Sequence, residues 1–280
     1  MKTVLMVFTK IPRKGVVKTR LTQAQGGILT KKEAKDLYEA MVLDVIEACQ
    51  TLGERELWLC HDRDGEREYL EKMLQGLAQP EKLAGIFADE GGHFNDCMQY
   101  ATDYILRRGA DDRRADALII VGGDLPTFQP HMLEEAIQKL ERLSRSEAGL
   151  KAALPGVKAL DGGALGAAIV EGACQEGGFS LIGYTAATPF TYDSVFYNLD
   201  GVTALDMLVE RAKKTEIPFS VVEMMPDMDI PLDLASAITN VRALELAARY
   251  DPAVLAPKRV VAYLDETGLQ AVALPPESRN

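Results

Sequence analysis

Thr3-Val-Leu-Met-Val-Phe8 is a short, continuous apolar run, and it is followed directly by Thr9-Lys-Ile-Pro-Arg-Lys-Gly-Val-Val-Lys-Thr-Arg-Leu21. Such a run predicts a strand that is buried on both faces, as in a parallel sheet. The segment after it has five basic residues in the eleven positions from Lys10 to Arg20. A basic loop at the end of a buried strand can bind phosphate oxygens. A solvated run of charges is the alternative, and composition alone does not decide between them.

Strand-like and helix-like patterns alternate along the rest of the chain. Apolar runs of strand length recur at 56–60, 83–88, 117–121, 164–170 and 219–222. Between them, apolar residues at helical spacing predict a helix that starts near Thr30, with further helices over 94–105 and 132–140, the last entered through Gln129-Pro130. The alternation predicts an α/β fold with a mostly parallel central sheet, helices on both of its faces and ligands at the carboxyl ends of the strands.

No linker divides the chain cleanly, so we expect one domain over residues 1–280. Residues 144–163 are rich in small residues with weak periodicity and are interpreted as an excursion between a helix and a strand. Residues 250–280 are predicted to be a C-terminal extension, with 252–269 forming a helix or strand packed on the domain. The end from Pro275 is predicted to be frayed.

Composition excludes several classes of protein. The net charge of −11 argues against a broad nucleic-acid surface. No apolar run reaches the roughly 18 residues that span a bilayer, and the N-terminal run is too short for a signal peptide, so we expect a cytoplasmic protein. The four cysteines and three histidines are scattered, which favours free thiols over a zinc site.

Lys18-Thr19 resembles the end of a phosphate-binding P-loop, but the frame G-x-x-x-x-G-K-[ST] is absent. Val17 stands where that motif has glycine, and the next convincing helix begins only about ten residues later. The sequence therefore argues against P-loop chemistry.

Two acidic turns are candidates for a metal site. Val121-Gly-Gly-Asp-Leu-Pro126 places Asp124 at the carboxyl end of a predicted strand, where a carboxylate can bind Mg²⁺ or Mn²⁺ together with a diphosphate. A helix cap or turn aspartate is the alternative. In Pro226-Asp-Met-Asp-Ile-Pro-Leu-Asp-Leu234, Asp233 can cap the helix that follows, which leaves Asp227 and Asp229 for a metal or for no ligand.

Glu176-Gly177-Gly178 leads into the apolar strand that runs to Tyr184. The glycine pair would let the backbone approach a ligand closely, with Glu176 pointing into the same space. A plain turn between a loop and a strand explains the pattern equally well.

Residues 8–21 together resemble F-A-K-x-P-x-x-G-x-V-K-T-R-L, the signature of a bacterial family of glycosyltransferase-like proteins in the nucleotide-diphospho-sugar transferase superfamily of type A fold. Further segments match in order. Residues 122–126 resemble the family's G-x-D-x-P, 176–183 its D-G-G-Y-x-L-I-G, and 227–234 its D-I-D-T-P-x-D-L, while 257–269 are similar to its C-terminal segment. The resemblance spans nearly the whole chain and implies a Rossmann-like fold.

The resemblance also implies roles for single residues. Asp124 and Asp229 would bind Mg²⁺ or Mn²⁺, and Glu176 would act on the acceptor hydroxyl as a base or by orienting it. Lys18, Asp124 and Glu176 would be the catalytic residues. The residues implied in binding the nucleotide phosphates are Lys10, Arg13, Gly15, Lys18, Thr19 and Arg20.

The chain departs from the family pattern on the acceptor side. Glu176 replaces an aspartate, and 92–98 read Gly-His-Phe-Asn-Asp-Cys-Met where the family has Gly-Asp-Leu-Gly-Glu-Arg-Met. The W-[SG]-T segment of the family has no clear counterpart near 197–203.

The sequence therefore predicts a metal-dependent transferase, with a nucleotide-sugar glycosyltransferase as the first hypothesis. A nucleotidyltransferase similar to guanylyltransferases, using a nucleoside triphosphate, is the main alternative. A nucleotide-binding protein that has lost turnover is the second. The expected partners are a nucleotide sugar or nucleoside triphosphate and a small-molecule acceptor, and the sequence does not indicate an oligomeric state.

Overall fold

A computed structural model describes residues 1–53, 55–107 and 112–272, and within them the chain forms one seven-stranded sheet. The strands are β1 (Thr3–Thr9), β2 (Leu57–His61), β3 (Leu83–Ala88), β4 (Ala117–Gly122), β5 (Ile169–Ala173), β6 (Phe179–Thr185) and β7 (Phe219–Val221). Their order across the sheet is β3-β2-β1-β4-β6-β5-β7. The pairs β1–β2, β2–β3, β1–β4 and β5–β7 are parallel, whereas β6 runs antiparallel to both of its neighbours. The predicted α/β fold with a mostly parallel sheet is confirmed.

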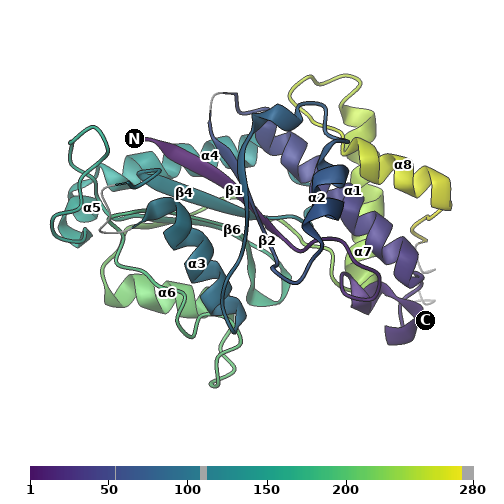
Figure 1. Ribbon diagram of the computed structural model, residues 1–280, viewed down its shortest axis with the longest axis horizontal. Coiled ribbons are helices and arrows are strands. Elements are labelled where there is room, and N and C mark those ends of the chain that lie inside the picture. Colours follow the sequence, from purple (N-terminus) through teal and green to yellow (C-terminus); the bar gives the residue numbers. More distant parts are fainter. Residues whose placement is uncertain (54, 108–111, 273–280) are drawn as a thin grey trace, which may run out of the picture.

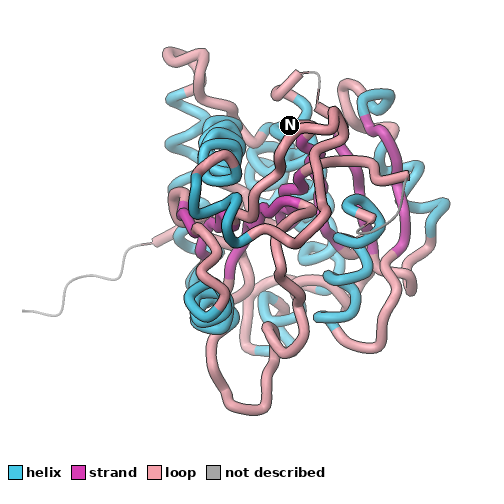
Figure 2. Tube along the Cα trace, turned by 90° about the vertical axis from the view of Figure 1, so that its left-hand side faces the viewer, coloured by secondary structure: helices cyan, strands magenta, loops and turns pink. Residues whose placement is uncertain are grey.

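Helices cover both faces of the sheet. They are α1 (Lys31–Gln50), α2 (Arg67–Leu74), α3 (Phe94–Leu106), α4 (Pro130–Ser144), α5 (Glu147–Ala152), α6 (Ala204–Lys214), α7 (Pro231–Ala247) and α8 (Lys258–Thr267). The buried side chains of α1, α2, α4, α7 and α8 join one apolar cluster, and those of α3 and α6 join a second cluster on the opposite face. Figure 2 shows the strands enclosed between helices. No helix in the described part of the chain is both long and apolar enough to cross a bilayer.

The start of α1 follows from a local sequence signal. Thr30 accepts a hydrogen bond from the backbone of Glu33 at 3.2 Å, and the Glu33 carboxylate accepts one from the Thr30 backbone at 2.6 Å. This reciprocal cap satisfies two amides at the end of the helix. It confirms the predicted helix start near Thr30.

The strand predicted over 164–170 was placed too early, because β5 begins only at Ile169. The backbone amides of Gly166 and Ala167, just before β5, donate to carbonyls of α4 and α5 and do not pair with a strand. Gly166 donates its amide to the carbonyl of Ser144 at 3.1 Å, and Ala167 donates to Gly149 at 2.8 Å. A Cβ on Gly166 would lie 2.2 Å from the Ser144 oxygen, so this close packing requires glycine. The predicted excursion over 144–163 contains the short helix α5.

The C-terminal extension contains a helix, α8, within the range predicted for a helix or strand. Buried Asp44 of α1 accepts hydrogen bonds from the backbone amides of Arg259 and Val260, at 3.0 and 2.9 Å. These bonds satisfy free amides in the first turn of α8 and fix it against α1. The segment from Pro275 that was predicted to be frayed lies outside the described residues.

The ends of β1 and β4 lie side by side at the centre of the sheet, with Phe8 paired to Gly122 in parallel register. In the strand order the chain continues from β1 to β2 on one side and from β4 to β5 on the other side, and such a switch point opens a crevice between the loops that follow the two strands. At Gly123 an added Cβ would lie 2.7 Å from the hydroxyl of Thr9, so the two loops approach closely only with glycine there. The basic loop and Asp124 therefore emerge next to each other.

Glu171 in β5 is an acidic residue buried in the sheet. Within the described part of the chain no group donates a hydrogen bond to its Oε2. Burial raises the pKa of Glu171 to about 7, because the charged form loses hydration. The folded chain therefore favours the protonated carboxyl group.

We predict that Glu171→Gln stabilises the protein relative to the parent increasingly as the pH rises above about 4.5. A carboxyl pKa that is higher in the folded than in the unfolded chain lowers stability as pH rises, and this loss develops between the ordinary value of 4.5 and about 7. The variant should match the parent near pH 4 and exceed it by about 2 kcal/mol above pH 7, measured by urea unfolding. Glu134→Gln, at an exposed site on α4, should show no such pH dependence. A pH-independent difference for Glu171→Gln would contradict the prediction.

Candidate active site

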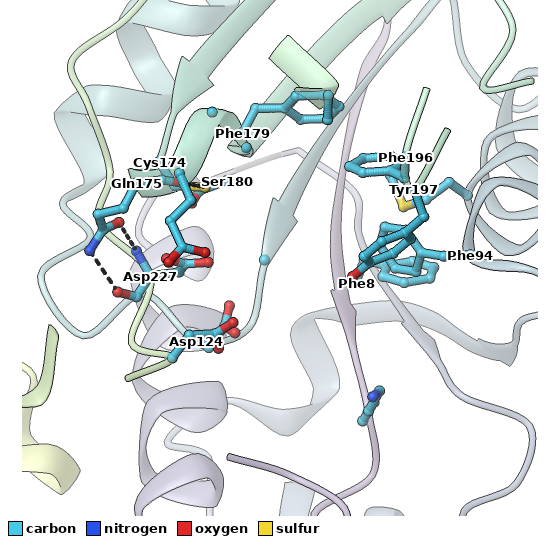
Figure 3. A pocket seen from close by; sticks show the side chains of 18 of the residues that line it. Phe8, Phe94, Asp124, Cys174, Gln175, Phe179, Ser180, Phe196, Tyr197 and Asp227 are labelled. Atoms are coloured by element: carbon cyan, nitrogen blue, oxygen red, sulfur yellow. Dashed lines mark hydrogen bonds between the residues drawn. The ribbon is translucent and has the colours of Figure 1, made fainter. Parts of the chain in front are cut away.

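A cavity of about 710 Å³ lies at the carboxyl ends of β1 and β4 and at the start of β6. Its lining combines residues of the basic loop, the turn after β4, the turn before β6, the loop after β6 and the acidic turn before α7. Figure 3 shows Asp124 and Asp227 on one side of this space and several aromatic side chains on the other. The cavity therefore has a charged half and an apolar half.

Lys18 is at the centre of the charged half. Its Nζ donates to Oδ2 of Asp124 at 2.6 Å and to Oδ1 of Asp229 at 2.7 Å, and only 3% of its side chain is exposed. The backbone of Lys18 is left-handed, with a φ of 49°, a conformation that costs a non-glycine residue free energy. From this strained backbone conformation the Lys18 side chain points into the protein and forms both ion pairs.

Arg20 extends the same charged cluster toward solvent. Its guanidinium is ion-paired to Asp229, and it lies 4.0 Å from a carboxylate oxygen of Glu176. Glu176 has a left-handed φ of 61° and a largely exposed side chain. Three residues implied as catalytic or metal-binding, Asp124, Asp229 and Glu176, are thus connected through Lys18 and Arg20.

The electrostatics follow from this crowding. Burial alone would lower the pKa of Lys18, but the charges of Asp124 and Asp229 outweigh it and raise that pKa above its ordinary value. Burial would likewise raise the pKa of Asp229, but Lys18 and Arg20 hold it below the usual range. Burial and the charges of Asp124 and Asp229 raise the pKa of Asp227 to about 6. The cluster therefore contains three neighbouring carboxyl groups, those of Asp124, Asp227 and Asp229, which could interact with a further positive charge.

The acidic turn is held in place by Gln175 and Asp233. The Gln175 side chain donates to the carbonyl of Asp227 at 3.1 Å and accepts from its amide at 3.2 Å. Asp233 accepts from the amides of Asp229 and Ile230, at 2.9 and 2.8 Å, at the start of α7. The prediction that Asp233 caps the following helix is confirmed, and its cap also orients Asp229.

Tyr38 of α1 fixes the point where the basic loop leaves β1. Its hydroxyl lies 2.8 Å from the Thr9 hydroxyl and accepts from the Lys10 amide at 3.1 Å. The Lys18 ammonium lies 5.7 Å from the centre of the Tyr38 ring, within the range of a cation–π contact. Tyr38 lies in the helix that the sequence predicts to start near Thr30, but the helical pattern does not reveal this polar function.

The remaining residues of the predicted phosphate loop divide into two groups. Lys10 and Thr19 line the cavity, whereas Arg13 and Gly15 are not among its lining residues. Arg13 is ion-paired to Asp62, which follows β2 and also accepts a hydrogen bond from the Ile11 amide. Arg13 thus ties the loop to the neighbouring strand end. Asp62 carried no recognisable signal in the sequence, because its position depends on the pairing of β1 with β2.

Five aromatic residues line the apolar half, and we call them the aromatic wall. They are Phe8, Phe94, Phe179, Phe196 and Tyr197. Their rings pack at steep angles, with centroids 5.8 Å apart for Phe8 and Phe94 and 4.7 Å apart for Phe94 and Phe196. Sequence reasoning missed this group because its members come from four separate segments of the chain. The only signal was indirect, since 92–98 and 197–203 depart from the family pattern.

The carboxylates are suited to a divalent cation. Asp124 and Asp229 direct one oxygen each to a single point, which the Lys18 ammonium holds. Mg²⁺ and Mn²⁺ commonly take one or two carboxylates and complete their coordination with water and substrate phosphates. Among the described residues, no three acidic, histidine or cysteine side chains gather as a ready-made metal site. Asp124 and Asp229 could hold a cation together with water and phosphate only if Lys18 gave up this position.

A family model described as "Uncharacterized protein conserved in bacteria (DUF2064)" matches residues 45–199, which is more than half of the chain. The chain belongs to this family. The matched region includes Asp124, Glu176 and most of the aromatic wall, whereas the basic loop and Asp229 lie outside it. No curated protein matches the sequence.

Two solved structures share the fold over almost their whole length. A protein from Desulfovibrio desulfuricans G20, provisionally assigned as a nucleotide-diphospho-sugar transferase, is 20% identical with a TM-score of 0.67, over 95% of this chain and 96% of that chain. A cytidylyltransferase from Leptospira borgpetersenii serovar Hardjo-bovis (strain JB197) is 10% identical with a TM-score of 0.50, over 98% and 99%. At these identities the likeness shows that this chain shares the fold of these two structures.

We predict that Lys18→Met increases the affinity for Mn²⁺ in the absence of nucleotide by about tenfold or more. The variant removes the positive charge between Asp124 and Asp229 and exposes the two carboxylate oxygens that Lys18 engages, while Asp229 keeps its ion pair with Arg20 through the other oxygen. Electron paramagnetic resonance of free Mn²⁺ measures this affinity directly.

Lys14→Met is the matched control, because Lys14 is exposed and does not line the cavity. It should bind Mn²⁺ like the parent, and adding Asp124→Asn to Lys18→Met should abolish the gain. Equal Mn²⁺ affinity in Lys18→Met and the parent would show that the ammonium and the metal do not share a position.

Proposed function

We propose that the protein is a transferase that binds an activated nucleotide with its diphosphate against Lys18 and Arg20 and transfers a glycosyl group to a small-molecule acceptor. The observation that carries the proposal is the convergence of Lys18 on Asp124 and Asp229 in a large cavity at the switch point of the sheet. Phosphate oxygens and a divalent cation both suit this mixture of charges.

The reaction requires charge stabilisation at the leaving group. As the acceptor oxygen bonds to the anomeric carbon, the bond from that carbon to the phosphate oxygen breaks and the nucleoside diphosphate leaves. Lys18 and Arg20 would stabilise its developing charge, because fixed cations in a partly buried site need little reorganisation. A Mg²⁺ or Mn²⁺ ion held by Asp124 and Asp229 would supply further charge neutralisation when bound.

Glu176 is the candidate base for the acceptor hydroxyl. Its carboxylate lines the cavity, lies near Arg20 and is held out by a left-handed backbone between β5 and β6. It would receive the hydroxyl proton as the new bond forms, or orient the hydroxyl for attack. Gly177 and Gly178 beside it let the chain turn sharply into β6.

Fold comparison supports an activated nucleotide as the donor, since the two similar structures bear the names of a nucleotide-diphospho-sugar transferase and a cytidylyltransferase. The second name supports nucleotidyl transfer from a nucleoside triphosphate as the competing function. The same cations would then stabilise pyrophosphate as the leaving group.

The two functions are separated by thermal-shift measurements with nucleotide sugars and nucleoside triphosphates, each with and without Mg²⁺ or Mn²⁺. We expect nucleotide sugars to raise the melting temperature, because binding to the folded state alone stabilises it. Stabilisation by triphosphates alone would refute glycosyl transfer. Release of nucleoside diphosphate that Asp124→Asn abolishes would exclude a protein without turnover.

We predict that Lys18→Met and Arg20→Ala each weaken binding of the most strongly stabilising nucleoside diphosphate by at least tenfold. Each removes one charge-assisted contact to phosphate, which contributes roughly 1.5–3 kcal/mol. Titration calorimetry in the presence of Mg²⁺ gives the affinities. Lys14→Met should bind as the parent does, because Lys14 lies outside the cavity. If all three variants kept the parent affinity, the loop would be only a charged surface.

A further inference from the structure

The aromatic wall leaves apolar ring surface facing an open cavity. Tyr197 is 91% exposed to solvent, and Phe94 is 39% exposed. Both residues line the cavity, so the exposed surface is directed at a ligand space as well as at bulk water. A ligand that covers these rings gains free energy in proportion to the apolar area removed from water.

The wall is held in place and cannot easily collapse into the cavity. The side chain of Asn95 donates to the carbonyl of Phe196 and accepts from its amide, both at 2.8 Å. The Asn198 side chain closes the next turn by bonding to the amide and carbonyl of Val202, at 3.0 and 2.8 Å. Tyr197 lies between the segments that these hydrogen bonds fix, and it adopts a left-handed φ of 51°. A left-handed backbone costs a non-glycine residue free energy, so the contacts around Tyr197 must hold it in this conformation.

Ring geometry selects the shape of the ligand. The plane of Phe94 is turned by 79° from that of Phe196 and by 73° from that of Tyr197. Rings set edge to face leave their outer faces and edges open, and a further flat ring fits against them in a stacked or T-shaped contact. The polar groups of Asn95 and Asn198 are engaged with backbone, so the wall offers few partners to a strongly polar group.

The position of the wall assigns it to the acceptor. Phe179 follows the turn that contains Glu176, the candidate base, and its ring lies 5.0 Å from that of Phe196. The start of α3 and the loop after β6 meet here through Phe94 and Tyr197, whose ring centroids lie 6.3 Å apart.

We propose that the aromatic wall binds a planar, uncharged ring of the acceptor, so that the protein selects acceptors whose reacting hydroxyl lies on or next to such a ring. The proposal rests on the proposed transferase function, because it assigns the wall to the second substrate. Its new content is the chemical class of that substrate.

The test uses 4-methylumbelliferone, a fluorescent planar phenol, at mildly acidic pH where its hydroxyl is protonated. Fluorescence anisotropy should show saturable binding to the parent. Phe94→Ala and Tyr197→Ala should each weaken binding by about tenfold, because each removes a ring contact. Tyr197→Phe keeps the ring and should retain the parent affinity, which excludes a merely misfolded loop as the cause.

Leu199→Ala is the matched control, since Leu199 is fully exposed in the same loop and does not line the cavity. It should bind the probe as the parent does. Absence of saturable binding, or parent affinity in both Phe94→Ala and Tyr197→Ala, would overturn the proposal. A loss of nucleoside diphosphate affinity in these two variants would also overturn it, because the wall would then hold the donor's base.

The same measurements separate this proposal from the proposed function. Asp124→Asn should bind the probe normally, since Asp124 lies on the opposite side of the cavity (Figure 3). Probe binding that depends on Phe94 and Tyr197, without nucleotide binding or nucleoside diphosphate release, would refute the transferase while upholding ring binding at the wall.

Discussion

Lys18 imposes the constraint on which the arrangement of the site depends. Its ammonium neutralises Asp124 and Asp229, which lie 106 and 211 residues further along the chain. Two carboxylates held this close would repel each other without a cation between them, and burial strengthens that repulsion. The left-handed backbone at Lys18 is tolerated because the ion pairs and the sheet around them fix the loop. Under the proposed function, a nucleotide or metal ion that binds here would exchange one set of charges for another and would not simply fill an empty pocket.

Much of the fold could be predicted from local patterns. The buried run of β1 and the helix start at Thr30 are encoded within a few residues, and the structure has both. The start of β5 was placed wrongly because apolar residues before Ile169 are buried by helix ends, and a hydrophobic run does not reveal which backbone groups pair. The antiparallel direction of β6 likewise depends on tertiary pairing with β4 and β5.

The charged half of the site was more predictable than the apolar half. Lys18, Asp124 and Asp229 occur in motifs whose place after strands gives them a common edge of the sheet. Arg13 occurs in the same basic loop, yet it pairs with Asp62 because the parallel register of β1 and β2 brings Asp62 beside it. Aromatic residues carry no such signal, because in sequence a buried core ring and a ligand-facing ring look alike. Only the fold shows that Phe94 and Tyr197 meet.

Under the proposed function, the two halves of the cavity would serve different physical needs. Charge developing on a phosphate leaving group is stabilised best by cations that are already in position, which the buried Lys18 provides. Recognition of a second substrate next to so many charges needs a surface that does not compete for them, and apolar rings meet this requirement. A hydroxyl group carried on a flat ring would then lie between the wall and Glu176, at the boundary of the two halves. Under the two proposals, the loop after β1 would hold the phosphates, and the segments at the start of α3 and after β6 would select the acceptor.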